Sequence, residues 1–255
     1  MTRPVKSRRE RIREATLVEM RSVARELLVD QGSTAVTINA VARRMGMSGP
    51  ALYRYYASRE ELVAAVTADF YRELGAVMEK ARDAHPEEAA ARRLLDMCRA
   101  MREWSIAHPA EFGWMFARPI PGPEQPEARS PRLMAGRDFE RVFLDEVVRL
   151  WRKRPFKVPR TEELPESLRD QMLRYSRLLD GRLPPGAAHV FLECWIRLYG
   201  LLCMEVLRQL DFAYTDVTPL FESRLADMCA TLGLEYEAPG DRAPQPLSTG
   251  KKTEG

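Results

Sequence analysis

The sequence predicts an all-α protein, with an N-terminal three-helix helix-turn-helix domain followed by a larger helical domain. Apolar residues recur at helical spacing in successive segments, and clusters of proline and glycine separate these segments. Residues 187–210 are apolar around most of a helix circumference, which is typical of a helix covered on every side. We expect domains at 1–57 and 58–236 and a disordered tail at 237–255.

Length and composition narrow the class of protein. A chain of 255 residues with 45% hydrophobic and 30% charged residues can bury one sizeable core and a small satellite domain. No apolar run approaches the length of a membrane span, and no apolar segment follows the basic N-terminus. We therefore expect a cytoplasmic protein without a membrane partner.

Positive charge is concentrated at the N-terminus. Residues 1–60 contain twelve Lys or Arg and six Asp or Glu, a net charge of +6, whereas the rest of the chain carries −3. Such a distribution favours contact with phosphates, although single arginines also occur on ordinary solvated faces. The basic arm at residues 3–13 either follows a DNA backbone or minor groove or is a frayed end.

Residues 37–56 form the helix-turn-helix. Thr37 precedes a short apolar stripe as an N-cap, and Gly46 follows the stripe where a chain leaves a helix in a left-handed conformation. Met47 should then be a buried plug, and Ser48 should cap a second helix that ends near Tyr56. The stripe of the first helix consists of Ile38, Val41, Ala42 and Met45.

The outer side of the second helix has the chemistry of a DNA-binding surface. Small residues allow close approach, and hydroxyls and a guanidinium suit phosphates and base edges. The alternative is an ordinary helical hairpin with partly buried tyrosines. We expect bases to meet Gly49, Pro50, Ala51 and Arg54, and phosphates to meet Thr37, Ser48, Tyr53 and Tyr55.

The order T-I-x-x-V-A-x-x-M-G-M-S-x-x-A-L-Y-R-Y-Y-x-S-R-E-E-L resembles the N-terminal signature of the TetR (tetracycline repressor) family. The resemblance covers about the first quarter of the chain. It implies a dimeric bacterial transcription regulator that binds a palindromic operator of double-stranded DNA and leaves it on binding a small molecule. It also implies that Arg59 contacts a phosphate.

Three long helices are expected beside the helix-turn-helix. One precedes it and two follow it. Residues 20–28 form an apolar face that ends at Gly32, and this face should pack on the inner side of the helix-turn-helix. Ser58 and Glu61 form a capping box that begins a helix with a long apolar stripe through about residue 84. A third helix runs from after Pro86 to His108, and Pro109 stops it.

Large and adaptable side chains gather around residues 97–116. In the architecture that the resemblance implies, these helices border an effector cavity, and methionine and aromatic walls suit a small apolar or aromatic ligand. The alternative is a filled core and a DNA-binding regulator with no effector. The proline-rich segment 118–131 is a surface loop that could gate the cavity. The pocket candidates are Met97, Met101, Trp104, Phe112, Met115 and Phe116.

The last two helices should form the dimer interface, and Thr218 should be the N-cap of the second of them. One protomer covers only one side of the apolar helix at residues 187–210, so the same helix of a second subunit should cover the other. Trp195, Tyr199 and Gly200 resemble a Trp-x-x-x-His-Gly element of one subgroup of the family, with tyrosine in place of histidine. Several of the candidates for the dimer interface could instead be intramolecular core. The candidates are Gly200, Leu202, Val206, Phe221, Leu225, Met228 and Cys229.

We expect no catalytic residues, no metal site and no cofactor. The cysteines lie in apolar helical patterns without ligand spacing, and the three histidines are scattered singly. An enzyme would need converging titratable groups, which the helices do not offer. The insert at 153–185 should contain an irregular piece followed by a helix at residues 168–179, and it has no recognisable role.

Overall fold

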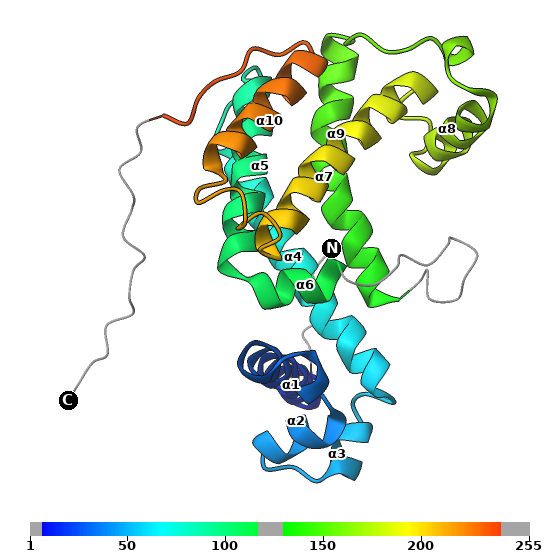
Figure 1. The fold of residues 1–255 in the computed structure, drawn as a ribbon. Helices are drawn as coiled ribbons and strands as arrows, with labels where there is room; N and C mark the ends of the chain where they lie inside the picture. The colour runs from blue at the N-terminus through cyan, green and yellow to red at the C-terminus, as the bar shows by residue number, and fades with distance from the viewer. Residues whose placement is uncertain (1–6, 117–129, 241–255) are drawn as a thin grey trace.

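The computed structural model describes residues 7–116 and 130–240 (Figure 1). Within these ranges the regular structure consists of ten α-helices and two short 3₁₀ helices, Ser33–Ala35 and Thr161–Glu163, with no strand. The all-α prediction is confirmed. Residues 118–129 of the predicted gating loop and most of the predicted tail lie outside the described residues. The last two residues of that loop, Ser130 and Pro131, are the N-cap and the first residue of a helix.

Three helices form a small head at the bottom of Figure 1: α1 (Arg8–Gln31), α2 (Ile38–Arg44) and α3 (Gly49–Tyr53). Their apolar faces meet in one buried cluster, as the helical spacing predicts. Gly32 ends α1 with φ 82°, a conformation that favours glycine. The buried residues of the head include Met20, Ala24, Leu27, Leu28, Val36, Ile38, Val41 and Leu52.

Helix α4 (Arg59–Asp83) joins the head to the body. The Ser58 side chain accepts a hydrogen bond from the Glu61 amide at 3.2 Å, as the capping box predicts. The Glu61 carboxylate, however, accepts from the Ala57 amide at 2.6 Å and not from that of Ser58. The start of α4 is therefore held by bonds to two preceding residues.

Six further helices make the body: α5 (Ala90–Ala107), α6 (Pro109–Phe116), α7 (Pro131–Lys153), α8 (Glu166–Leu178), α9 (Pro185–Val206) and α10 (Thr218–Thr231). Helix α4 packs closely on α5 and α7, and α9 lies against α8 and α10 (Figure 1). A buried ion pair joins α5 to α7, because both Arg93 and Glu146 are almost fully enclosed and lie 3.0 Å apart.

Three helix boundaries differ from the sequence prediction. Helix α3 ends at Tyr53 and not near Tyr56, since the chain continues only as a turn whose Tyr56 amide donates to the Leu52 carbonyl. Thr218 is the first residue of α10 and not its N-cap, because its amide is held by the Asp216 carboxylate at 2.8 Å. Helix α8 begins at Glu166, two residues before the predicted start.

Helix α9 corrects the expectation that no apolar run has the length of a membrane span. Its 22 residues include an 18-residue window of mean hydropathy 1.3, which is enough to cross a membrane by length and composition, and 39% of that window is buried. Core helices of soluble proteins pass the same test. In this fold α9 packs on α5, α8 and α10, so burial in the body accounts for part of its apolar surface.

Candidate nucleic-acid interface

Local bonds fix the geometry of the helix-turn-helix. The Thr37 hydroxyl oxygen accepts a hydrogen bond from the Ala40 amide at 3.1 Å and caps α2, as predicted. Gly46 has φ 67°, and the Met47 amide then donates to the Ala42 carbonyl at 2.8 Å. Leu52 and Tyr56 are buried and hold α3 against the head. Met47 is only half-buried, because it borders the groove described below.

The predicted base-facing residues lie on α3 and at its C-cap, and two of them, Gly49 and Ala51, are half-buried. Pro50 and Arg54 are exposed, and Tyr53 is 53% exposed, although it is a large aromatic residue. Gly49 lies so close to α2 that a Cβ added to it would be 2.8 Å from Oδ1 of Asn39. A short helix with small residues at its start and hydroxyls and a guanidinium at its end can approach a groove closely.

Two predicted phosphate contacts have a different environment from the one expected. The Ser48 side chain makes no capping hydrogen bond to α3. The Arg59 guanidinium is used inside the protein: Nε donates to the Val36 carbonyl at 2.7 Å, and Nη2 donates to that of Ser33 at 3.1 Å. Arg59 therefore ties the start of α4 to the segment before α2, a role that the sequence pattern did not reveal.

The first turns of α1 form a second wall beside α3. A capping box begins the helix, because the Ser7 hydroxyl accepts from the Glu10 amide at 3.2 Å and the Glu10 carboxylate accepts from the Ser7 amide at 2.7 Å. Between α1 and α3 runs an open groove of about 740 Å³, which we call the arm groove. It is lined by Arg8, Arg9, Ile12, Arg13, Met47, Ala51, Arg54 and Tyr55.

Charge distinguishes the arm groove from the rest of the molecule. Within the described residues, no carboxylate forms an ion pair with Arg8, Arg9, Arg13 or Arg54, whereas many arginines of the body are paired, as in Arg102–Glu205 at 2.6 Å. From residue 7 onward, the predicted arm is a helix with a capped start and not a frayed end. Arginines without acidic partners beside an exposed helix form a surface suited to phosphates.

Two family models match the sequence. The model of the bacterial regulatory proteins of the tetR family matches residues 21–66. The model of the tetracyclin repressor-like C-terminal domain matches residues 94–228, more than half of the chain. This chain belongs to the TetR family. The family assignment confirms the predicted class, a transcription regulator and not an enzyme.

Curated relatives and solved structures agree with this TetR assignment. The HTH-type transcriptional regulators Mb1846 of Mycobacterium bovis and Rv1816 of Mycobacterium tuberculosis are each 34% identical over 122 residues, 48% of this chain and 50% of theirs. The chain thus spans about half the length of the curated relatives it matches. The crystal structure of SCO4313, described as a regulatory protein, is 28% identical with a TM-score of 0.66 and covers 88% of this chain and 100% of its own.

A structure of a protein with unknown function from Rhodococcus sp. RHA1 shows the same fold. It is 17% identical, with a TM-score of 0.59, over 83% of this chain and 94% of its own. At this identity the likeness concerns the fold alone.

Ion pairs connect the TetR head to its body. The Arg21 guanidinium pairs with Asp69 of α4 and donates to the Tyr56 hydroxyl at 3.3 Å. Burial lowers the pKa of Arg21, but these two partners raise it above its ordinary value. One turn further along α1, Arg25 donates to Glu73 of α4 at 2.6 Å. These contacts fix the orientation of the head on α4.

The predicted effector-pocket residues are packed together in the body. Met97, Met101, Trp104, Phe112 and Met115 are buried, and Phe116 is half-buried. The Phe116 ring lies 4.7 Å from that of Phe112 and 5.1 Å from that of Tyr199, between ring centroids. An open pocket of about 130 Å³ between α4 and α7 is lined by other residues, among them Tyr71, Gly75 and Phe139.

Most of the predicted interface residues are also buried inside one protomer. Leu202, Phe221, Leu225, Met228 and Cys229 are enclosed, and Gly200 and Val206 are half-buried. These side chains therefore belong to the intramolecular core beneath α9 and α10, which is the alternative that the sequence left open. The outer apolar residues of α9 are Ile196, which is 57% exposed, and Met204.

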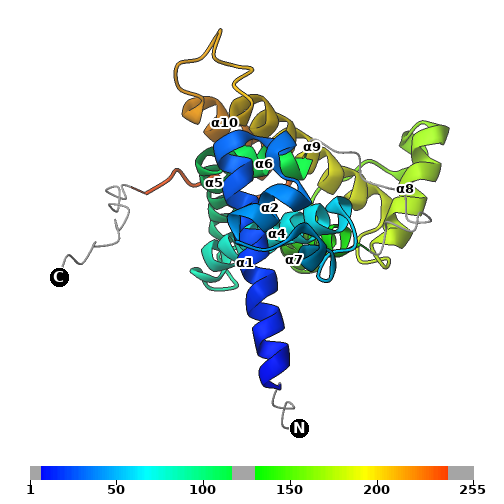
Figure 2. The ribbon, with the colours of Figure 1, turned by 90° about the horizontal axis from the view of Figure 1, so that it is seen from below.

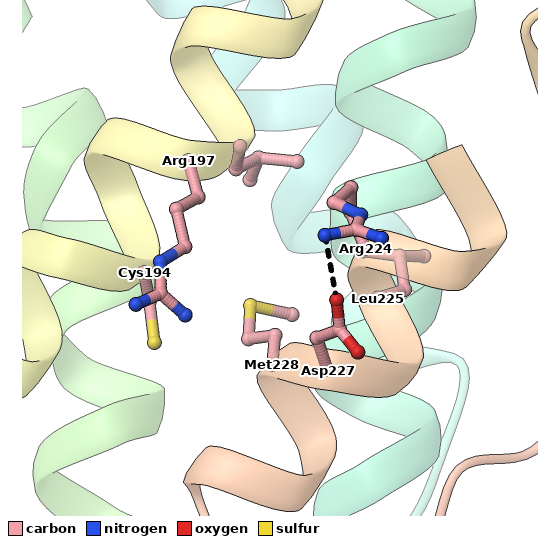
Figure 3. Close-up of a pocket in the computed structure, with 7 residues that line it drawn as sticks. Cys194, Arg197, Arg224, Leu225, Asp227 and Met228 are labelled. Atoms are coloured by element: carbon pink, nitrogen blue, oxygen red, sulfur yellow. Dashed lines mark ion pairs between the residues drawn. The ribbon is translucent and has the colours of Figure 1, made fainter. Parts of the chain in front are cut away.

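A shallow hollow of about 20 Å³ lies between α9 and α10 (Figure 3). Arg197 reaches toward it from α9, and Arg224 pairs with Asp227 on α10 at 2.9 Å. On the inner side of the same α9, the Trp195 and Tyr199 rings are stacked, with centroids 5.9 Å apart and an interplanar angle of 4°. Burial raises the pKa of the Tyr199 hydroxyl above its ordinary value.

Proposed function

We propose that this chain is a homodimeric repressor that binds an inverted-repeat operator with α3 of each subunit in one major-groove half-site. The observation that carries the proposal is the exposed face of α3 beside arginines that form no ion pair with any described carboxylate. Bases would meet Gly49, Pro50, Ala51 and Arg54, and phosphates would meet Thr37, Ser48, Tyr53 and Tyr55. The DNA-binding domain would comprise residues 1–57.

The dimer would form through the outer faces of α9 and α10. Ile196 and Met204 expose apolar surface on α9, and the shallow hollow of Figure 3 lies between α9 and α10. Burying these residues against the same helices of a second copy forms a closed two-fold interface. Two heads related by a two-fold axis then match the symmetry of an inverted repeat.

A small apolar or aromatic effector would release the operator. The candidate ligand-contacting residues on α6, Phe112, Met115 and Phe116, lie on a helix that is bonded directly to α1 through Glu111. An effector that fits better when the two heads are wrongly spaced weakens DNA binding by its difference in affinity for the two states. Residues 58–236 would thus bind the ligand and dimerise.

A second candidate is a DNA-binding regulator that has no small-molecule effector. The dense packing of the predicted pocket residues favours it, because Phe116 contacts four other aromatic rings, those of Tyr71, Phe112, Phe139 and Tyr199. In this case the same body would serve only to hold the dimer together.

Selection of bound sequences from random duplex DNA tests the operator. We expect the wild-type protein to enrich an inverted repeat, and sedimentation of the complex to give two protomers for each site. Enrichment of a single half-site without symmetry, or of no duplex at all, would contradict the proposal.

A thermal-shift screen separates the two candidate functions. An apolar or aromatic effector that binds the folded protein should raise the melting temperature, by mass action, and weaken a gel shift with the selected operator. A panel of apolar and aromatic compounds in which none does either would favour the regulator without an effector.

A further inference from the structure

The first turns of α1 stand away from the rest of the molecule. No residue of α1 before Met20 is buried, and Ile12 is 57% exposed. Figure 2 shows this end of the helix extending beyond the body. A solvated helix of this length is marginal in water, yet a capping box fixes its start and the Arg13 guanidinium lies 5.1 Å from the centroid of the Tyr55 ring. The structure thus holds the arm beside α3.

The residues that the arm presents to α3 share one side of the helix. At about 100° for each residue, Arg8, Arg9, Ile12 and Arg13 fall within an arc of roughly 140°. These four residues and Arg54 line the arm groove. From Arg8 to Arg13 the helix rises about 7.5 Å, which is roughly twice the axial rise of about 3.4 Å from one phosphate of a DNA strand to the next.

We propose that the arm groove binds the sugar–phosphate backbone of the duplex next to the half-site. Each subunit would then contact DNA at two places, through α3 at the half-site and through the arm groove at the adjacent backbone. This proposal rests on the proposed function. The groove is open along its length and has α3 as one wall, so a duplex that meets α3 runs alongside it. Its cationic residues are guanidiniums without carboxylate partners among the described residues, and these suit phosphates and carry no sequence information.

The arm would therefore add affinity and salt dependence and leave base preference to α3. Each phosphate that a cation neutralises contributes about 0.9 to the slope of log affinity against log salt concentration. Three arm arginines account for a slope of up to about 2.7 for each engaged subunit. The contribution should disappear when the DNA flanking the half-site is removed.

The test compares a triple variant, Arg8→Gln, Arg9→Gln and Arg13→Gln, with wild type in gel shifts on the selected operator. Glutamine keeps helix propensity and removes three charges. A control variant removes three charges from exposed arginines at the far end of the body, Arg152→Gln, Arg174→Gln and Arg177→Gln. A third variant with lysine at positions 8, 9 and 13 restores the charge.

We expect the arm variant to lose up to about 2.7 units of salt slope for each subunit at an unchanged melting temperature, and the control to lose much less. The lysine variant should recover the slope. In hydroxyl-radical footprints, the arm variant should leave the flanking backbone unprotected while the protection within the half-site stays the same.

Wild-type slope and footprint in the arm variant, with operator binding intact, would overturn this inference and leave the proposed function standing. Failure of the wild-type protein to bind any duplex would overturn the proposed function itself and the arm contact with it. The two failures are thus distinguished by the behaviour of wild type.

Discussion

Arg25 of α1 donates a hydrogen bond from Nε to Oε1 of Glu111 on α6 at 2.8 Å, a contact between residues 86 positions apart. The Glu111 residue is only 3% exposed, so its carboxylate relies on this partner. Arg25 also donates to Glu73 of α4 at 2.6 Å, and the Trp104 indole of α5 donates to the same carboxylate at 2.9 Å. One guanidinium therefore joins the head to two helices of the body.

Arg25→Gln should destabilise the protein because it leaves the enclosed Glu111 carboxylate without its cation. Breaking a fully buried pair costs at least about 3 kcal/mol, and we expect about 2 kcal/mol here because Arg25 itself is partly exposed. Urea unfolding measures the loss. Arg177→Gln, an exposed change on α8, is the control, and an equal loss in both variants would show that the Arg25 contacts contribute nothing specific.

Arg54→Gln and Arg59→Ala should have different effects. Arg54 lies in the arm groove, so its loss should reduce the salt slope of DNA binding by about one unit at an unchanged melting temperature. Arg59 bonds two carbonyls, so its loss should lower the free energy of unfolding by about 1–2 kcal/mol. Gel shifts across a salt series and thermal melts check both. A one-unit slope loss from Arg59→Ala would support the phosphate contact that the TetR signature implies.

Gly46→Ala should destabilise the turn between α2 and α3. A residue with a Cβ at φ 67° costs about 1 kcal/mol or more. Gly113→Ala is a matched control, because Gly113 lies inside α6 with no atom within 4 Å of the added Cβ and alanine there favours the helix by about 1 kcal/mol. Denaturant unfolding should move in opposite directions for the two variants; the same direction in both would refute the role of the turn.

Ile196→Glu should separate the proposed dimer. A charge placed on the outer face of α9 cannot be buried against the same face of a second copy without a large cost. Sedimentation velocity should show a dimer for wild type and a monomer for the variant. Leu178→Glu, at a similarly exposed apolar residue of α8, should remain dimeric. A monomer from Leu178→Glu and a dimer from Ile196→Glu would place the interface elsewhere.

Acid should weaken the connection between head and body through Glu73. Burial raises the pKa of Glu73, but hydrogen bonds from Arg25 and Trp104 outweigh it and hold the pKa below its ordinary value of 4.5. The folded state therefore gains stability above pH 4.5 and loses it as the pH falls through the lowered value. The difference in melting temperature between wild type and Glu73→Gln should shrink on going from pH 7 to pH 3.5; a constant difference would exclude this ionisation as the cause.

The sequence by itself determined the features that depend on neighbours in the chain. The Thr37 cap, the left-handed Gly46 and the apolar stripes of α1, α2 and α4 are as predicted, because caps, turns and helical periodicity involve residues within a few positions. The TetR signature lies in this same local segment. Hence the class of protein followed from about a quarter of the chain.

Only the tertiary structure decided which side of a helix is covered and by what. The apolar pattern of Leu202 and Phe221 fits an interface as well as it fits a core. The packing of α9 and α10 within one protomer buries both residues. Arg59 donates to carbonyls 23 and 26 positions earlier in the chain. The arm groove exists because the start of α1 lies beside α3. Such contacts join distant parts of the chain, and helical periodicity carries no information about which surfaces meet.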